Sequence, residues 1–168
     1  MIAVREALSI GRKQLAKKGV INSLFETKLL IRNILKISDE DLISTSEVFL
    51  SESQFETFQS FLERRKKSEP IAYILNKREF WKDSFYVNNS TLIPRPDSEI
   101  IIETVLNLIP NKDKKLKFAD LGTGSGCLII SLLKEYKYSE GVGIDNSKEA
   151  IKVAEKNKNI LSNNERLS

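Results

Sequence analysis

The chain has 168 residues, of which 40% are apolar and 30% charged, and its 27 basic and 23 acidic residues give a net charge of +4. This composition is typical of a globular protein with one or two small domains. With no histidine and a single cysteine, the sequence excludes a Ser-His-Asp or Cys-His catalytic system, a zinc site that needs imidazole, and an internal disulfide.

Residues 1–68 have the pattern of a small all-helical domain. Apolar residues at helical spacing predict a helix over 2–18. The tetrapeptide Ser23–Glu26 is a capping-box pattern and predicts a second helix with Ser23 as its N-cap. A shorter helix is expected from Ser38 or Asp39, and a second capping box, Ser51–Gln54, precedes a helix that ends in a basic run.

Residues 69–96 are expected to form a linker that contains a β-hairpin. Aromatic residues predict strands over 80–81 and 85–87, joined by residues 82–84. The prolines of Leu92–Asp97 exclude regular structure there. A helix is expected from Asp97 or Ser98, with four apolar residues facing inward: Ile100, Ile101, Val105 and Leu108.

Residues 97–168 are expected to begin an α/β Rossmann-like domain. A strand over 116–121, a helix over 125–138, a strand over 141–145 and a helix over 147–160 alternate in the way that gives a parallel sheet. Five of the seven glycines lie between Gly122 and Gly143, which predicts that the backbone there needs unusual conformational freedom.

The segment Asp120–Gly126 lies where the first of these strands meets its helix. A glycine-rich turn there lets a ligand approach the backbone beside the partly positive start of a helix. Asp145 closes the second strand, and a carboxylate in that position can accept hydrogen bonds from both ribose hydroxyls of an adenosine group. The sequence therefore predicts a nucleoside-containing cofactor. The alternative is a turn that only packs a helix, with Asp145 as a helix cap.

The glycine spacing departs from the G-x-G-x-x-G/A pattern of dinucleotide sites, because Gly126 comes one residue early. Asp120 would repel a pyrophosphate, whereas S-adenosylmethionine has no phosphate and has positive charge on its sulfonium and ammonium groups. These residues favour S-adenosylmethionine over NAD, and an NAD oxidoreductase is the more distant alternative.

Asp120–Gly126 resembles motif I of class I methyltransferases, and Asp145 resembles the acidic residue of their motif II. Three upstream segments, Glu69–Ile74, Glu79–Trp81 and Leu92–Glu99, resemble the signature of the HemK/PrmC family. Members of that family are protein-(glutamine-N5) methyltransferases that modify the glutamine of the GGQ motif in peptide chain release factors. The resemblance covers essentially the whole chain.

The resemblance implies a role for each segment. Residues 1–68 would help to dock the release factor, Asp145 would hold the ribose of the cofactor, and Arg95 and Pro96 would line the approach of cofactor or substrate. A structural salt bridge to Asp97 or Glu99 is an equally weighted alternative for Arg95. The methionine part of the cofactor would lie against the turn, which consists of Gly122, Thr123, Gly124, Ser125 and Gly126.

Two departures from the family pattern matter. Asn76 stands where the family usually has a glycine, and asparagine tolerates a left-handed backbone better than most residues. The catalytic signature Asn-Pro-Pro-Tyr does not occur in this sequence, so no catalytic residue is assigned. We therefore expect these residues to be the N-terminal part of a longer methyltransferase and to be inactive alone.

Other readings stay open. The longer protein could be a bifunctional or RNA-directed methyltransferase, because some relatives of the family are fused to a tRNA methyltransferase. It could also be a non-catalytic module that binds a release factor. Basic residues are spread evenly, so direct binding of nucleic acid is not expected from this segment. No apolar run is long enough for a membrane span, no metal site is expected, and the cysteine usage is consistent with a cytoplasmic location.

Overall fold

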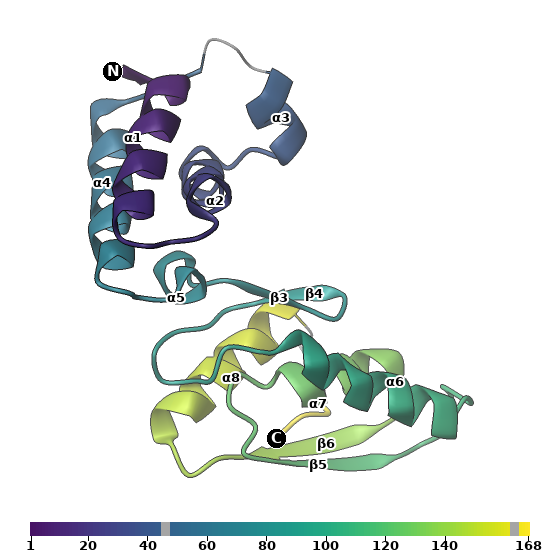
Figure 1. The fold of residues 1–168 in the computed structure, drawn as a ribbon. Coiled ribbons are helices and arrows are strands. Elements are labelled where there is room, and N and C mark those ends of the chain that lie inside the picture. The colour runs from purple at the N-terminus through teal and green to yellow at the C-terminus, as the bar shows by residue number, and fades with distance from the viewer. Residues whose placement is uncertain (45–47, 162–164) are drawn as a thin grey trace. The chain divides into compact units, whose positions relative to one another are not determined.

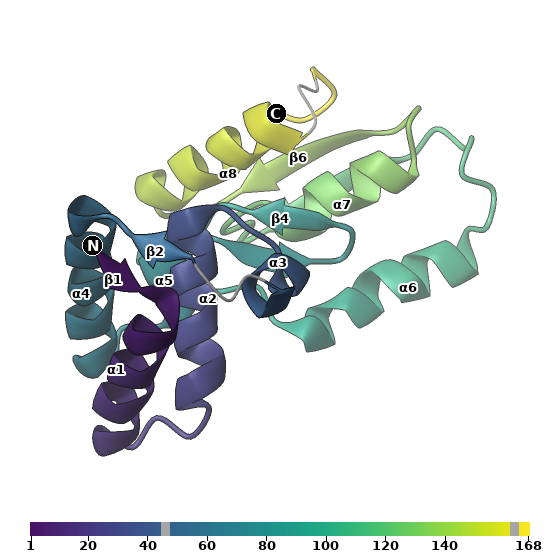
Figure 2. The same ribbon diagram turned by 90° about the horizontal axis from the view of Figure 1, so that it is seen from above.

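The structure, a computed structural model, describes residues 1–44, 48–161 and 165–168 (Figures 1 and 2). Contacts divide the chain into two compact units, Met1–Leu75 and Asn76–Ser168. The division falls after the expected boundary at residue 68, because the short helix α5 (Ile71–Leu75) places Ile74 in the core of the first unit.

The first unit is a helical domain with one small strand pair. Helix α1 packs against both α2 and α4 around a core that includes Leu15, Leu30 and Phe58. Ile2 and Ala3 pair antiparallel with Leu50 and Phe49, a strand pair that the helical pattern over 2–18 did not predict. Before α5, the elements are β1 (Ile2–Ala3), α1 (Val4–Lys17), α2 (Ser23–Leu35), α3 (Asp39–Ser44), β2 (Phe49–Leu50) and α4 (Glu52–Lys66).

One of the two predicted capping boxes is confirmed and the other is wrong. Ser51 caps α4: its Oγ accepts the N–H of Gln54 at 3.2 Å, and the Gln54 side chain accepts the N–H of Ser51 at 2.8 Å. Helix α2 instead has Asn22 in the N-cap position, without a side-chain cap. The carboxylate of Glu26 pairs with the guanidinium of Arg65 on α4, so it contributes to helix packing rather than to a cap.

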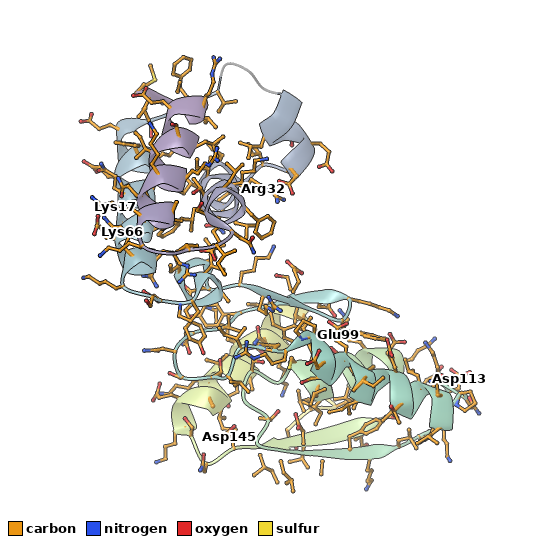
Figure 3. The ribbon with its side chains drawn as sticks, viewed as in Figure 1. Lys17, Arg32, Lys66, Glu99, Asp113 and Asp145 are labelled. Carbon is orange, nitrogen blue, oxygen red and sulfur yellow. The ribbon has the colours of Figure 1, made fainter. Side chains whose placement is uncertain are left out.

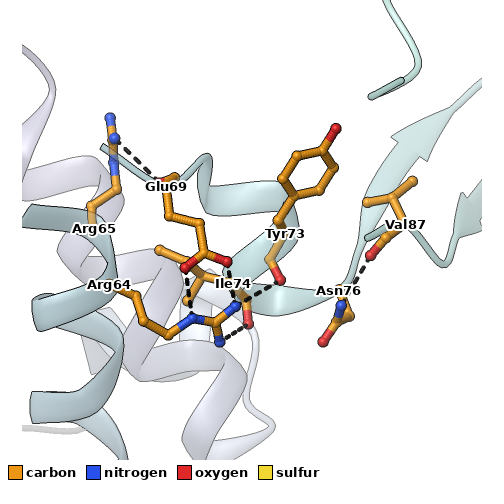
Figure 4. Close-up of polar contacts among 7 residues, drawn as sticks. All are labelled: Arg64, Arg65, Glu69, Tyr73, Ile74, Asn76 and Val87. Carbon is orange, nitrogen blue, oxygen red and sulfur yellow. Dashed lines mark hydrogen bonds and ion pairs between the residues drawn. The ribbon is translucent and has the colours of Figure 1, made fainter. Parts of the chain in front are cut away.

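Glu69 lies between α4 and α5, and Figure 4 shows its polar contacts. The guanidinium of Arg64 pairs with the carboxylate of Glu69 and donates to the carbonyls of Tyr73 and Ile74 at 3.3 and 3.4 Å. Hydrogen bonding to Arg64 lowers the pKa of Glu69. Arg64 thus satisfies carbonyls at the end of α5, which have no partner within so short a helix.

The second unit contains a hairpin and a parallel strand pair. Strand β5 pairs with β6 from Lys117 beside Glu140 to Leu121 beside Ile144, and the predicted order of strand, turn, helix, strand and helix is confirmed. Helix α7 covers one face of this pair, as Figure 1 shows. The elements are β3 (Arg78–Phe80), β4 (Asp83–Phe85), a 3-10 turn (Pro96–Ser98), α6 (Glu99–Leu108), β5 (Lys117–Leu121), α7 (Cys127–Glu135), β6 (Glu140–Ile144) and α8 (Lys148–Leu161).

The opposite face of β5 and β6 is exposed among the described residues. Along both strands every second residue is exposed, and these residues share this face: Lys117, Ala119, Leu121, Glu140, Val142 and Ile144. Near the C-terminus, Leu167 pairs in parallel with Gly141, on the edge of β6 away from β5. The unit is therefore the beginning of a Rossmann-like α/β fold with one helical layer in place.

The hairpin and α6 both differ from the prediction in register. The hairpin turn consists of Trp81 and Lys82, with Trp81 at a positive φ of 55°, so strands β3 and β4 lie earlier than expected. In α6 the buried face includes Ile102, whereas Ile100, Ile101 and Leu108 are 59%, 47% and 77% exposed. Because α6 is apolar on two sides, its periodicity alone did not identify the buried one.

Asn76 adopts the left-handed backbone that its place in the family pattern predicts, with a φ of 52°. Its side chain donates to the carbonyl of Val87 at 3.0 Å (Figure 4). The turn thus survives without glycine, because asparagine both tolerates this conformation and holds the neighbouring segment.

Glu135, at the end of α7, binds three donors from distant parts of the second unit. Trp81 Nε1 donates at 2.9 Å, Lys112 Nζ at 2.5 Å, and Lys82 also contacts the carboxylate. Burial by itself raises the pKa of Glu135, but the hydrogen bonds from Lys112, Lys82 and Trp81 outweigh it and lower the pKa to about 2. The carboxylate therefore holds the hairpin turn and the loop before β5 against α7.

We expect acid to weaken this cluster. The pKa of Glu135 is lowered on folding from 4.5 to about 2, so its stabilising effect is present above the unfolded value and is lost as the pH falls through the folded value. Because one pKa unit corresponds to about 1.4 kcal/mol, the free energy of unfolding should fall by ~3 kcal/mol as the pH drops through this range. Urea unfolding at a series of acidic pH values gives the free energy of unfolding as a function of pH. The slope of this dependence should be shallower for Glu135→Gln than for the unchanged chain. Glu155→Gln, at an exposed position on α8, should leave the slope unchanged, and equal slopes for all three would contradict the prediction.

Candidate functional site

The candidate site lies where β5 and β6 end side by side. The backbone N–H groups of Gly122 and Thr123 both donate to the carbonyl of Ile144, at 2.7 and 2.9 Å. The turn after β5 is therefore fixed directly against the last residue of β6. Figure 3 shows Asp145 at this end of the strand pair, with Asp113 at the opposite end.

The turn needs glycine for its backbone conformation. Gly122, Gly124 and Gly126 have φ values of 80°, 55° and 77°, which other residues rarely adopt. A Cβ atom added at Gly122 would meet nothing within 4 Å, and one at Gly124 would meet only the Gly122 carbonyl, at 3.9 Å. The turn therefore presents bare backbone to open space.

The other two glycines of this region serve a different purpose from the one predicted. Neither Gly141 nor Gly143 has a positive φ. A Cβ at Gly143 would lie 3.0 Å from Oγ1 of Thr123, and one at Gly141 would lie 2.8 Å from Cδ1 of Ile129. They allow the turn and α7 to pack closely on β6. The signal for this role is the alternation of glycine with Val142 along the strand, which leaves one face of the strand without side chains at Gly141 and Gly143.

Asp145 touches the glycine-rich turn. Its Oδ2 accepts the N–H of Gly124 at 2.9 Å, and its Oδ1 accepts the N–H of Ser147 at 2.9 Å. Hydrogen bonds from the backbone of Ser147 and Gly124 lower the pKa of Asp145, so the side chain is an ionised acceptor at neutral pH. The cap of α8 comes from Ser147, whose Oγ accepts the N–H of Ala150 at 3.2 Å. Asp145 is thus not the cap of that helix.

The two residues of the turn that are not glycine, Thr123 and Ser125, are both buried. Thr123 and Ser125 are 7% and 2% exposed, so in this structure they offer a ligand little side-chain surface. Thr123 Oγ1 donates to Oδ2 of Asp120 at 2.8 Å, which fixes that carboxylate at the start of the turn. Burial raises the pKa of the Cys127 thiol to about 11, so the thiol is protonated and is not a ready nucleophile.

Arg95 and Pro96 lie on the exposed segment before α6. Among the described residues, Arg95 forms no ion pair with Asp97 or Glu99, and Glu99 instead accepts the backbone N–H of Trp81 at 2.9 Å. Within the described ranges, no side-chain hydrogen bond or ion pair joins Arg95 to the glycine-rich turn. Hydrogen bonds thus bring together Asp120, the turn and Asp145. The role of Arg95 and Pro96 stays a prediction.

The residues at the strand ends fit a nucleoside that has no phosphate. The bare backbone of Gly122 and Gly124 leaves room for close approach, and each oxygen of Asp145 keeps a lone pair for a ribose hydroxyl after accepting one backbone N–H. The carboxylate of Asp120 adds negative charge at the turn, which suits a positively charged group and disfavours a pyrophosphate.

Comparison with known proteins identifies two regions. Residues 6–75 match the family model of the PrmC N-terminal domain, and residues 112–165 match a model of a methyltransferase domain. The release factor glutamine methyltransferase of Coxiella burnetii is 40% identical over 157 residues, which cover 94% of this chain and 56% of that protein. The enzyme of the same name from Buchnera aphidicola subsp. Schizaphis graminum is 40% identical over 136 residues, or 81% of this chain and 49% of that protein.

A third relative, the bifunctional methyltransferase of Rickettsia prowazekii, is 36% identical over 172 residues, covering 92% of this chain and 33% of that protein. The chain thus spans about half the length of the release factor methyltransferases that it matches, and a third of the bifunctional one. No helix in the described ranges has the length and apolar character of a membrane span.

Proposed function

We infer that this chain, whose residues 6–75 belong to the PrmC N-terminal domain family and whose residues 112–165 belong to a methyltransferase domain family, is part of a release factor glutamine methyltransferase. The longer protein would transfer a methyl group from S-adenosylmethionine to the glutamine of the GGQ motif in a peptide chain release factor. Because release factors act in translation, we place it in the cytoplasm.

One observation supports this proposal most strongly: the contact of Gly124 with Asp145. The 2.9 Å hydrogen bond holds a bare backbone turn and an ionised carboxylate at the same edge of the sheet. That edge is where open α/β sheets bind their ligands. The turn lets an adenosyl group approach the backbone closely, and the carboxylate can accept hydrogen bonds from both ribose hydroxyls.

Each part of the chain has a task in this proposal. Asp145 would accept the ribose hydroxyls, the backbone of Gly122 and Gly124 would lie against the methionine part, and Asp120 would face its positive end. S-adenosylmethionine, when bound, supplies an electrophilic methyl group on a positively charged sulfur. The helical domain, residues 1–68, would dock the release factor, and residues 93–96 would line the approach to the site.

The acceptor half of the reaction needs groups that this sequence does not contain. An amide nitrogen is a weak nucleophile, so it must be held in line with the methyl group and hydrogen-bonded as charge develops. No Asn-Pro-Pro-Tyr segment is present to hold the planar glutamine amide. We therefore expect these 168 residues to bind the cofactor without transferring its methyl group.

Titration calorimetry of the 168-residue chain with S-adenosylhomocysteine tests the cofactor assignment, with NADH as the competing nucleotide. Saturable binding of S-adenosylhomocysteine without binding of NADH is the expected result. Binding of NADH alone, or of neither compound, would refute the assignment. Radiolabelled methyl transfer to a release factor by the chain alone would refute the expected inactivity.

A second candidate is a bifunctional enzyme, favoured by the 36% identity to the Rickettsia prowazekii protein. The two candidates differ in their acceptors. Methyl transfer to both a release factor and an RNA by the longer protein would support the bifunctional enzyme, whereas transfer to the release factor alone would leave the first candidate.

A further inference from the structure

Asn157 lies in the middle of α8, is fully buried and makes three hydrogen bonds. Its Oδ1 accepts the N–H of Tyr86 at 2.7 Å, and its Nδ2 donates to the carbonyls of Tyr86 and Ser125, both at 2.9 Å. These partners are 71 and 32 residues away in sequence. A single side chain thus joins the segment after β4 to the glycine-rich turn.

The pairing with Tyr86 uses both hydrogen-bonding groups of that residue's backbone. A carboxamide has the same donor and acceptor as a peptide unit, so Asn157 acts here like one residue of a neighbouring strand. The pairing fixes the amide orientation, because exchanging the oxygen and nitrogen would put two acceptors and two donors face to face. Its second N–H is consequently directed at Ser125.

The Ser125 carbonyl belongs to the peptide unit that enters Gly126, the residue before α7. Gly126 has a φ of 77°, and its N–H donates to the carbonyl of Thr123 at 2.8 Å. Holding the Ser125 carbonyl therefore restricts rotation of the turn between Gly124 and α7. Without this partner a buried carbonyl would be left unsatisfied, and rotation of the peptide unit would be the way to relieve it.

We propose that Asn157 is a positioning residue that sets the conformation of the glycine-rich turn for the nucleoside and ties it to the hairpin segment at Tyr86. The effect on binding rests on the function proposed above. The role requires a carboxamide. Aspartate has the same shape, but it would place an acceptor against the carbonyls of Tyr86 and Ser125 and would add a buried charge.

The test compares Asn157→Asp with Asn159→Asp, which makes the same chemical change at an exposed position of the same helix. Both variants of the 168-residue chain, labelled with 15N-glycine, are titrated with S-adenosylhomocysteine. The seven glycines give few enough amide signals to resolve. For Asn157→Asp we expect at least a tenfold loss of affinity and shifted signals of Gly124 and Gly126, with Gly11 and Gly19 in the first unit unchanged. Asn159→Asp should match the unchanged chain.

The outcomes separate this proposal from the cofactor assignment. If the unchanged chain does not bind S-adenosylhomocysteine, the proposed function fails, and the glycine signals alone decide the role of Asn157. Unchanged Gly124 and Gly126 signals in a folded Asn157→Asp variant would overturn the proposal, as would a shift of all seven glycine signals. If Asn157→Asp does not fold, Asn157→Ser, which adds no charge and cannot span the three contacts, is judged by the same criteria.

Discussion

Replacing Gly126 with alanine is expected to lower the free energy of unfolding by about 2 kcal/mol and to weaken binding of S-adenosylhomocysteine at least tenfold. At a φ of 77°, alanine carries a backbone cost, and its Cβ would lie 3.0 Å from Cδ1 of Ile130 and 3.3 Å from Cβ of Ala154. Relief of these contacts moves the turn away from α7 and α8. Urea unfolding and calorimetry measure the two effects.

Gly122→Ala is the matched control for stability. Gly122 has a φ of 80°, but a Cβ there would meet nothing within 4 Å. Gly122→Ala should therefore lower the free energy of unfolding by only ~1 kcal/mol, which is the cost of placing alanine in a left-handed backbone conformation. Its new methyl group would enter the open space where the nucleoside would lie. Equal losses of stability in the two variants would show that packing around Gly126 is not the cause.

Asp145→Asn is expected to weaken binding of S-adenosylhomocysteine about 30-fold, equivalent to ~2 kcal/mol. The carboxylate accepts two backbone N–H groups and can still accept two hydroxyls, whereas an amide has one oxygen and would turn an N–H against a backbone donor. Because its hydrogen bonds lower the pKa of Asp145, the affinity should stay constant at neutral pH and fall only in acid, as the carboxylate takes up a proton.

Asp113→Asn serves as the control, since this residue lies in the loop at the other end of the strand pair (Figure 3). In calorimetry, Asp113→Asn should bind S-adenosylhomocysteine with the same affinity as the unchanged chain. An Asp145→Asn variant that binds as tightly as Asp113→Asn would exclude the ribose role, even if the chain does bind the nucleoside.

The sequence was sufficient for those parts of the fold that depend on local patterns. The glycine-rich turn, the strands on either side of α7 and the Ser51 cap follow from residues close together in sequence, and all are present. Asn76 was predicted correctly for the same reason, because left-handed backbone is a property of one residue. The contact between the turn and Asp145 follows from parallel strands ending at one edge.

The parts that were missed depend on distant partners. Glu26 pairs with Arg65 instead of a helix start, and α6 buries Ile102 instead of Ile100, because neighbours decide which of two apolar sides is covered. Asn157 gave no signal at all, since an asparagine in a helix is ordinary until Tyr86 and Ser125 are seen beside it. Such long-range polar contacts are not encoded in periodicity.

Trp81 is the only tryptophan of the chain, and its indole N–H donates to Glu135 within the second unit. Indole fluorescence excited selectively therefore reports on the second unit alone, whereas far-ultraviolet circular dichroism records the helices of both. Melting curves from the two signals will coincide if the units unfold together and will separate if one unfolds first. The chain thus contains its own optical probe for deciding which unit a substitution has destabilised.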